Sequence, residues 1–360
     1  MRCAIVGLGR WGQRLVDSCQ IEGRPLGDDI HFTHAVARSP DKHNVYCAKQ
    51  RLVYRKDYQS VLADPEIDAV VLATPHSQHF EQITAAATAG KHVFVEKPFT
   101  LGEEDAALAA QSARNAGIEV AVGHNRRFLS ALQDLRSMIG QGDLGTITHM
   151  EGNFSGPFGL AYNREMWRAS PIESPAGGMT AMGIHIVDAF IYLGGPIASV
   201  NALSLNLVLD VDMDDTTSVM MRFENGASAY LSTLCASARQ WRLQVFGTRG
   251  WVQLRDHHIM DVCMVDQQPT TKLYEVADIE RAELEAFARA CNGGDPYPVT
   301  LKEAVHGIAV QEAIIESAKV TSDMQAVRKQ GQWHPQARSE NFPIGIHAGT
   351  NAASTKRQMK

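Results

Sequence analysis

Three glycines follow the first apolar run of the chain at a fixed spacing. The run covers residues 3–6, and Gly7-Leu8-Gly9-Arg10-Trp11-Gly12 comes directly after it. In this pattern the first glycine permits a tight turn, the second allows close approach to a pyrophosphate, and the third lets a helix pack against the strand. Amides at the helix start then face the phosphates. We therefore predict a dinucleotide-binding turn that uses Gly7, Gly9, Arg10, Trp11 and Gly12.

The first third of the chain alternates compact apolar runs with segments of helical length. The later runs lie at residues 32–37, 69–73, 93–95 and 120–122. The candidate helices lie at residues 11–20, 78–89 and 103–115. Uninterrupted apolar runs are typical of strands that are buried on both faces of a parallel sheet. We predict an α/β N-terminal Rossmann domain, with a doubly wound parallel sheet, over residues 1–123.

After residue 123 the elements are grouped instead of alternating. Strand-like runs follow one another from residue 197 to about residue 276, and Glu224-Asn225-Gly226 between two of them is a strong hairpin signal. Consecutive strands without intervening helices indicate an antiparallel sheet. We expect an α+β C-terminal domain with a large, mostly antiparallel open sheet over residues 124–329, and a polar C-terminal tail over residues 330–360.

Composition excludes several classes of partner. At 360 residues the chain is too long for one ordinary core, and its net charge of −6 provides no basic surface for nucleic acid. Its apolar runs are too short to span a membrane. The six cysteines are scattered, and the first apolar run begins at residue 3, so we expect no signal peptide. We expect a cytoplasmic protein with reduced thiols.

The end of the second predicted strand bears on cofactor choice. An acidic side chain there would bind the ribose 2′-hydroxyl of NAD, whereas arginine accommodates the 2′-phosphate of NADP. The chain has Ala37-Arg38-Ser39 at this point, without a carboxylate. This favours NADP bound by Arg38 and Ser39, with NAD as the second choice; the alternative is that Arg38 is a solvated surface charge.

Two further blocks resemble a known family. Thr74-Pro75-His76-Ser77-Gln78-His79, and Gly90-Lys91-His92-Val93 followed by Glu96-Lys97-Pro98, resemble the glucose–fructose oxidoreductase/inositol dehydrogenase (Gfo/Idh/MocA) family. The resemblance covers roughly residues 1–320. It implies an NAD(P)-dependent dehydrogenase or reductase that transfers hydride between nicotinamide and a carbinol or carbonyl carbon of a sugar, cyclitol or related polyol.

The resemblance also implies a catalytic lysine. In that family the lysine of Glu-Lys-Pro lies beside the nicotinamide, which here is Lys97. The position agrees with general rules, because Lys97 follows a buried strand at the edge where open α/β sheets bind ligands, and a cation there can stabilise an alkoxide. The other cofactor-side residues that the resemblance implies are Thr74, Pro75, His76, His79 and Glu96.

A second catalytic element of the family is a helix with Asp-x-Gly-x-His. This chain has Ala181-Met182-Gly183-Ile184-His185, so alanine replaces the aspartate. His185 is the candidate acid/base, because the unperturbed pKa of histidine suits proton exchange at neutral pH. Asp188 lies three residues on, and on a helix it would share the face of His185 and either orient it or contact substrate.

Other substrate contacts are predicted with a scaffold role as the alternative. Asn125 and Arg127 follow the last buried strand, and Trp167-Arg168 resembles a pair found in many members of the family. We expect Asn125, Arg127, Arg168, His185 and Asp188 on the substrate side. No metal site is expected, since His257-His258 lacks a third ligand at suitable spacing.

Alternative functions and assembly remain open at this stage. Ala181 favours a non-catalytic dinucleotide-binding sensor or regulator, whereas Lys97 and His185 favour an enzyme. A dehydrogenase of a non-sugar cyclic diol is another alternative. We expect a homodimer or homotetramer, since a sheet face that helices leave uncovered needs a partner.

Overall fold

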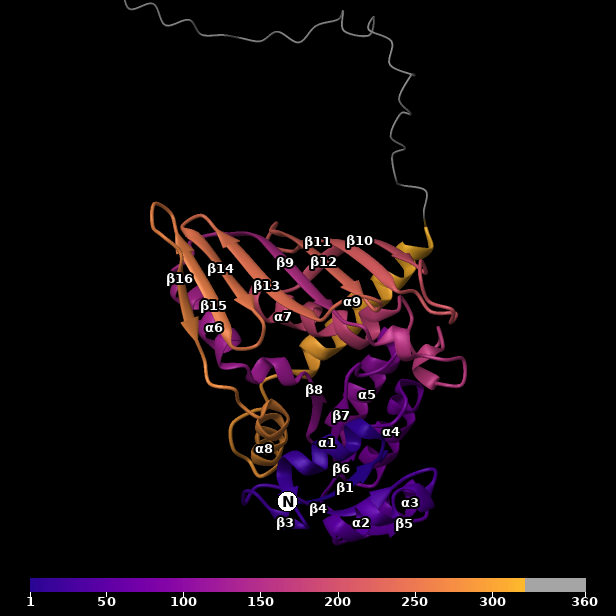
Figure 1. The fold of residues 1–360 in the computed structure, drawn as a ribbon. Helices are drawn as coiled ribbons and strands as arrows, with labels where there is room; N and C mark the ends of the chain where they lie inside the picture. The colour runs from indigo at the N-terminus through magenta and orange to yellow at the C-terminus, as the bar shows by residue number, and fades with distance from the viewer. Residues whose placement is uncertain (321–360) are drawn as a thin grey trace, which may run out of the picture. The chain divides into compact units, whose positions relative to one another are not determined.

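The computed structural model describes residues 1–320. The predicted tail at 330–360, and the last residues of the predicted second domain, lie outside the described residues. Within the described residues the chain forms two large sheets and a two-stranded hairpin, with the N-terminal elements around one large sheet and most later elements around the other (Figure 1). No helix in this part of the chain is both long and apolar enough to cross a membrane.

The first sheet is parallel throughout, in the order β5-β4-β1-β6-β7-β8. Its strands are β1 (Arg2–Val6), β4 (His31–Val36), β5 (Val53–Arg55), β6 (Ala69–Leu72), β7 (His92–Glu96) and β8 (Val120–Gly123). Its helices are α1 (Arg10–Cys19), α2 (Asn44–Gln50), α3 (Tyr58–Leu62), α4 (His79–Thr88) and α5 (Glu103–Ala116). In chain order these strands run 3-2-1-4-5-6, the order of the doubly wound dinucleotide-binding fold. The predicted Rossmann domain is confirmed.

Burial explains why these segments form strands and helices. All four residues of β6 are fully buried, as expected for a strand with a neighbour on each side and helices on both faces. In α5 the buried residues are Ala106, Ala109, Ala110 and Ala113, whose spacing of three and four places them on one face. Because these side chains are small, the helix can approach the sheet closely.

Short elements of the first domain escaped the sequence pattern. They are β5, α2, α3 and the hairpin formed by β2 (Gln20–Ile21) and β3 (Arg24–Pro25). Each has seven residues or fewer, so none presents the apolar periodicity that identifies longer elements.

The second sheet has eight strands in the order β10-β11-β12-β9-β13-β14-β15-β16. The strands are β9 (Ile147–Ser155), β10 (Ile197–Leu205), β11 (Thr216–Phe223), β12 (Ser228–Leu234), β13 (Gln240–Gly247), β14 (Gly250–Arg255), β15 (Ile259–Met264) and β16 (Thr270–Leu273). All neighbours are antiparallel except β9 and β12. The predicted mostly antiparallel sheet is confirmed, as is the Asn225-Gly226 turn between β11 and β12, where Gly226 has a φ of +92°.

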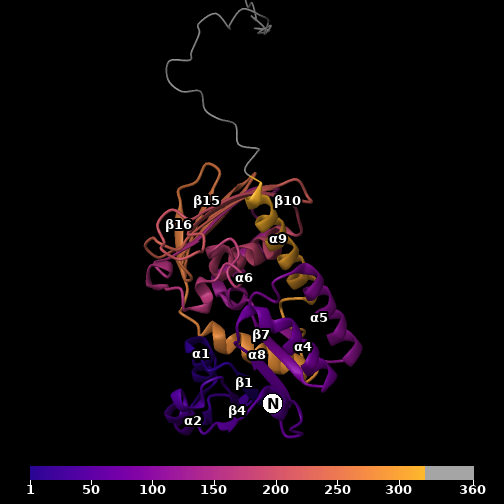
Figure 2. The same ribbon diagram turned by 90° about the vertical axis from the view of Figure 1, so that its right-hand side faces the viewer.

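Only one face of the second sheet is covered by helices of the described chain. These are α6 (Ser130–Gln141), α7 (Ile184–Gly194) and α9 (Leu301–Lys319), and Figure 2 shows α6 and α9 on the same side of the sheet. Along β11 the side chains alternate, with Val219 and Met221 buried under the helices and Met220 half exposed on the other face. The register places Tyr230, Phe246 and Trp251 on the same outer face, together with polar residues such as Glu151 and Gln244.

One helix of the C-terminal half packs on the first sheet. α8 (Ile279–Cys291) follows β16 in sequence, yet Leu284 and Phe287 belong to the core of the first domain. The rings of Phe287 and Phe94 lie 5.8 Å apart, and the Tyr297 hydroxyl donates to the carbonyl of Val122 at 3.1 Å. The two halves therefore share a core, and the limits of the predicted domains at residues 123 and 329 stay a prediction.

Candidate active site

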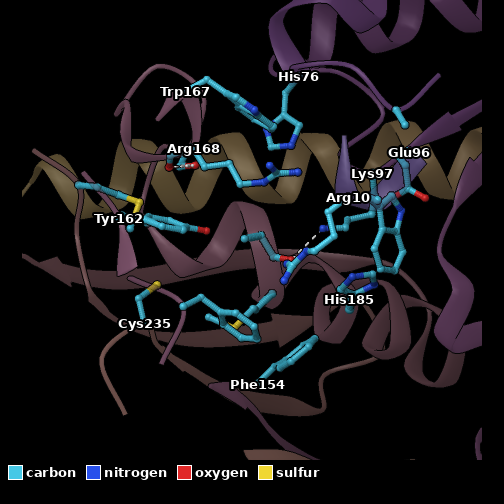
Figure 3. Close-up of a pocket in the computed structure, with 18 of the residues that line it drawn as sticks. Arg10, His76, Glu96, Lys97, Phe154, Tyr162, Trp167, Arg168, His185 and Cys235 are labelled. Carbon is cyan, nitrogen blue, oxygen red and sulfur yellow. Dashed lines mark hydrogen bonds between the residues drawn. The ribbon is translucent and has the colours of Figure 1, made fainter. Parts of the chain in front are cut away.

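Two adjoining hollows lie at the carboxyl ends of the parallel strands. The outer hollow is lined mainly by residues 6–12, 36–39, 42–43 and 73–75. The inner hollow lies between the end of β7 and the second domain, and Figure 3 shows its main side chains. Six residues line both hollows: Arg10, Trp11, Ala73, Thr74, Trp167 and Arg168. The hollows therefore form one continuous cleft at the topological switch point of the sheet.

The glycine turn has the geometry expected of a pyrophosphate cradle. Gly7 has a φ of +99°, and a Cβ there would lie 2.6 Å from the carbonyl oxygen of Ala73. A Cβ on Gly12 would lie 1.9 Å from the oxygen of Gly7, so only glycine lets α1 approach β1. Gly9 has open space beside it and begins α1 without a side-chain cap. The amides at the start of α1 are thus available to a phosphate.

The far end of the outer hollow carries more positive charge than the sequence pattern indicated. Arg38 and Ser39 line the hollow as predicted, and Lys42 and His43 line it as well. We overlooked Lys42 because it lies past Pro40, outside the strand tip that the motif describes. The side chain of Arg38 is exposed, so it is available to a ligand in the hollow and to solvent.

Some residues of the segment 74–79 line the cleft, and others are buried behind it and support its walls. Thr74 lines both hollows, Pro75 the outer hollow and His76 the inner hollow. The fully buried His79 contacts the carbonyl oxygens of Pro98 through Nδ1 (2.9 Å) and of Thr74 through Nε2 (3.3 Å). His79 therefore supports the turns on either side of the cleft and does not line it.

His76 contacts two residues of the segment that follows β9, Glu173 and Trp167. Its Nδ1 contacts the main-chain oxygen of Glu173 at 2.7 Å, and its ring packs edge-on against Trp167, with centroids 5.0 Å apart. Burial lowers the pKa of His76 to about 3, so the ring is neutral. Arg168 stacks on Trp167, its Cζ lying 4.1 Å from the ring centroid, and it lines both hollows (Figure 3). Its predicted contact with substrate stays a prediction.

Lys97 lines the inner hollow and directly follows the last residue of β7. Its Nζ donates a hydrogen bond to the main-chain oxygen of Ala181 at 2.8 Å, the dashed line in Figure 3. Burial lowers the pKa of Lys97 to about 8, and the carboxylate of Glu96 opposes this shift. Burial likewise raises the pKa of Glu96 to about 7. Lys97 can therefore change its charge near neutral pH.

His185 lines the inner hollow, but its electrostatics differ from the expectation. Its pKa is held well below the usual value of histidine by burial, and then by the positive charges of Arg126 and Lys97. His185 is therefore neutral at physiological pH and does not exchange a proton by titrating there. Its Nε2 lies 3.3 Å from Nη1 of Arg126, which can only donate, so the ring proton sits on Nδ1.

A π-helical turn, Met179–Gly183, precedes α7 and shapes the wall of the inner hollow. Gly177 has a φ of +55°, and a Cβ there would lie 1.9 Å from the carbonyl oxygen of Asp214. The turn brings the carbonyl oxygen of Ala181 to Lys97 and the side chains of Met182 and His185 into the hollow. Such turns are frequent at functional sites.

Asp188 and Arg127 are not in the cleft. Nε and Nη2 of Arg127 donate to the two carboxylate oxygens of Asp188 at 2.9 and 2.8 Å, and both side chains are nearly inaccessible. Nη1 of Arg127 also lies 3.2 Å from Glu303. Asp188 thus faces Arg127 and makes no hydrogen bond to His185. We reassign both residues from substrate contacts to the scaffold.

Asn125 is also held within the protein. Its Nδ2 donates to Glu280 at 2.9 Å, and its Oδ1 accepts from Arg126 at 2.6 Å. Arg126, which we did not single out from sequence, is the member of this segment that lines the inner hollow. In the motif Asn125-Arg126-Arg127 the two arginines are adjacent. The sequence alone therefore does not say which one forms an ion pair with a carboxylate and which one faces the hollow.

The remaining wall of the inner hollow is apolar, and sequence reasoning missed it. Phe154 and Phe158, at and just after the end of β9, meet Met213 and Cys235 from two other segments of the second domain. No motif joins them, so only the folded chain reveals their proximity. Within residues 1–320 no group of three or more histidine, cysteine or acidic side chains is placed to hold a metal ion.

Comparison with known protein families gives two matches. A model described as an oxidoreductase family with an NAD-binding Rossmann fold (GFO_IDH_MocA) matches residues 1–124, and a model of the GFO/IDH/MocA C-terminal domain matches residues 132–253. Together they cover the glycine turn, Lys97, Ala181 and His185.

Individual relatives are consistent with these matches. A scyllo-inositol 2-dehydrogenase (NAD(+)) from Bacillus subtilis strain 168 is 30% identical over 279 residues, which cover 72% of this chain and 79% of that protein. A D-xylose 1-dehydrogenase (NADP(+)) from Haloferax volcanii is 27% identical, with 73% and 81% covered. A levoglucosan dehydrogenase solved with NADH and levoglucosan has a TM-score of 0.78 at 21% identity, covering 89% of this chain and 97% of that one. This last likeness concerns the fold.

Proposed function

This chain belongs to the Gfo/Idh/MocA family of NAD(P)-dependent oxidoreductases, and from that premise we propose that it transfers hydride between NADP and a sugar, cyclitol or related polyol. The hydride moves to or from a carbinol or carbonyl carbon of the substrate. Several relatives are named as inositol or D-xylose dehydrogenases, which supports an enzyme over a non-catalytic sensor.

The position of Lys97 carries this proposal. Lys97 lines the inner hollow, which shares Thr74 and Arg168 with the outer hollow and its phosphate cradle. Its pKa of about 8 allows the amine to hold or release a proton. A hydroxyl that gives up hydride from its carbon must also lose its proton, and a nearby neutral amine can accept it. In the reverse direction the ammonium form donates that proton and stabilises the alkoxide.

The outer hollow fits a dinucleotide. Open space beside Gly9 and the uncapped start of α1 leave room and donors for a pyrophosphate, with Gly7 and Gly12 shaping the turn and Arg10 lining the passage to the inner hollow. A nicotinamide bound there would supply or take the hydride. Trp11, Thr74, Pro75 and Arg168 would enclose it.

Three side chains would then act at the reacting hydroxyl, each in a different way. Neutral His185 can hydrogen-bond a substrate hydroxyl through its Nδ1 proton, which has no partner within residues 1–320. We therefore keep His185 as a catalytic candidate that orients the hydroxyl, while Lys97 moves the proton. Glu96, buried next to Lys97, tunes the charge of the amine.

The proposal also covers the choice of cofactor, the oligomeric state and the location of the protein in the cell. Arg38, Ser39 and Lys42 at the end of the outer hollow offer cations and a hydroxyl to a 2′-phosphate, which supports NADP over NAD. The uncovered face of the second sheet, with Met220 half exposed, supports a homodimer or homotetramer. A cytoplasmic location remains part of the proposal.

A turnover screen tests this function. Polyols, aldoses, cyclitols and cyclic dihydrodiols are each offered with NADP and with NAD, and reduction of the nicotinamide is followed by absorbance. Turnover of a sugar or polyol supports the proposal, and turnover of dihydrodiols alone would favour the non-sugar alternative. Tight NADP binding without turnover of any compound would favour the sensor.

A further inference from the structure

We propose that the substrate carries a carboxylate, which the guanidinium of Arg126 binds in the inner hollow. This rests on the proposed function and narrows its substrate class, from polyols in general to sugar acids or related hydroxy acids. The charges in the inner hollow and the pairing of two neighbouring arginines support it.

The inner hollow is lined by an excess of positive charge. Its cations are Arg10, Lys97, Arg126 and Arg168, and among the described residues Glu96 is its one acidic side chain. Burial raises the pKa of Glu96, which weakens even this negative charge. Low-dielectric walls formed by Phe154 and its apolar neighbours strengthen the field of these cations.

The cations divide between the two hollows. Arg10 and Arg168 line both, so they are within reach of the phosphates of a cofactor in the outer hollow. Lys97 and Arg126 line the inner hollow alone. Once Lys97 is assigned to the reacting hydroxyl, Arg126 is the cation that remains for the rest of the substrate.

Arg126 has no carboxylate of its own. Within residues 1–320 it forms no ion pair, whereas Arg127 beside it is paired with Asp188 and Glu303. Nη1 of Arg126 reaches only two neutral groups, Oδ1 of Asn125 at 2.6 Å and Nε2 of His185 at 3.3 Å. Its buried Nε has no hydrogen-bond partner in this part of the chain. The carboxylates of Glu280, Glu283 and Glu96 act on Arg126 through space and none pairs with it directly. The guanidinium can therefore take a direct anionic partner from a ligand.

The surroundings of Arg126 suit a planar anion. Its Cζ lies 5.1 Å from the ring centroid of Phe154, and both side chains line the inner hollow. Arginine binds carboxylates through paired, charge-assisted hydrogen bonds, which a neutral hydroxyl cannot match. At position 181, where the family pattern has a carboxylate that could accept from substrate hydroxyls, this chain has a methyl group. The hollow thus offers donors and needs an acceptor from the substrate.

Matched acid and neutral probes test this inference. D-glucuronate with D-glucose, D-galacturonate with D-galactose, and D-gluconate with D-glucitol are titrated by calorimetry into the protein saturated with NADP. We expect at least one acid to bind about tenfold or more tightly than its neutral counterpart. Arg126→Gln should weaken the binding of that acid by about tenfold to a hundredfold. It should change the affinity for the neutral probe by less than about threefold. Arg126→Lys should restore part of the loss.

Controls separate this inference from the proposed function. Arg164→Gln removes an exposed arginine that lines neither hollow, and it should leave both affinities unchanged. The inference is overturned if every acid binds no better than its neutral counterpart, or if Arg126→Gln weakens both equally. Turnover of neutral sugars with weak acid binding would overturn it while leaving the proposed function intact. Arg126-dependent acid binding without hydride transfer would support the anion site and overturn the proposed function.

Discussion

The amine of Lys97 donates a hydrogen bond to the main-chain oxygen of Ala181 at 2.8 Å, and this bond joins the two halves of the cleft. Lys97 directly follows β7 of the first sheet, and Ala181 lies in the π-helical turn ahead of α7. The side chain at position 181 is a methyl group, so the amine meets a carbonyl dipole there and no charge. The protonation of Lys97 is therefore set mainly by burial and by Glu96.

Replacing Lys97 with methionine tests its part in the reaction. Lys97→Met keeps the bulk of the side chain and removes the proton-carrying group, so kcat should fall by about a hundredfold or more while NADPH still binds. Steady-state kinetics and fluorescence titration measure the two effects. Lys49→Met, on the exposed surface of α2, is the matched control. A kcat within a fewfold of the wild type would remove Lys97 from the mechanism.

The pH dependence of the reaction should follow the lowered pKa of Lys97. The neutral amine accepts the proton during oxidation, so the oxidation rate should rise with pH and level off above about 8. The reduction rate should show the opposite trend, because the ammonium form is lost above about 8. An unperturbed lysine would place both changes near its ordinary value of 10.5.

Ala181→Asp provides the control for this pH profile. A carboxylate at position 181 would favour the charged amine, so the oxidation profile should shift to higher pH. Rates that do not depend on pH between about 7 and 9 in the wild type would contradict the assignment of Lys97 as the proton carrier.

Cofactor discrimination should depend on the far end of the outer hollow. We expect NADPH to bind about tenfold to a hundredfold more tightly than NADH, with a smaller margin at high salt because Arg38 is exposed. Ala37→Asp with Arg38→Ile should reverse the order, and Lys42→Ala should reduce the margin. Fluorescence titration measures each affinity. NADH binding as tightly as NADPH in the unmodified protein would make Arg38 a surface charge.

The ion pair of Arg127 and Asp188 should contribute to stability. Asp188→Asn leaves the buried guanidinium with Glu303 alone, so the free energy of unfolding should fall by about 3 kcal/mol. Urea unfolding measures this change, with Asp210→Asn, at an exposed position, as the control. If both variants unfold at the same urea concentration, the pair does not stabilise the fold.

Assembly should depend on the open face of the second sheet. Light scattering at micromolar concentration should report a dimer or tetramer, and Met220→Asp should weaken it by placing a charge on that face. Val276→Asp changes an apolar residue that is also exposed, outside the sheet, and should have no effect. A wild-type monomer of 39.4 kDa would contradict the prediction.

The fold was largely predictable because its signals are local. Continuous apolar runs identified five of the six parallel strands, all but β5, and their ends agree with the structure to within two residues. The Asn225-Gly226 turn identified the β11–β12 hairpin for the same reason, since two residues decide the turn. The short elements around α2 were missed because too few residues carry their pattern.

The site was predictable where a motif fixes a backbone position, as at Gly7 and Lys97. It was not predictable for Arg126, Arg127 and Asp188, where the pairing of charges decides the role. Sequence spacing placed Asp188 beside His185, but the folded chain turns its carboxylate to Arg127.

The sequence by itself thus determined the longer strands of the parallel sheet, how the phosphate cradle turns, and that Lys97 follows β7. Only the tertiary structure decided which arginine is neutralised, which one faces the hollow, and that His185 is neutral. Local patterns act over a few residues, whereas Arg127 meets partners 61 and 176 positions away, and Asn125 meets one 155 positions away. Charge and burial depend on such distant contacts, so they are defined only once the chain has folded.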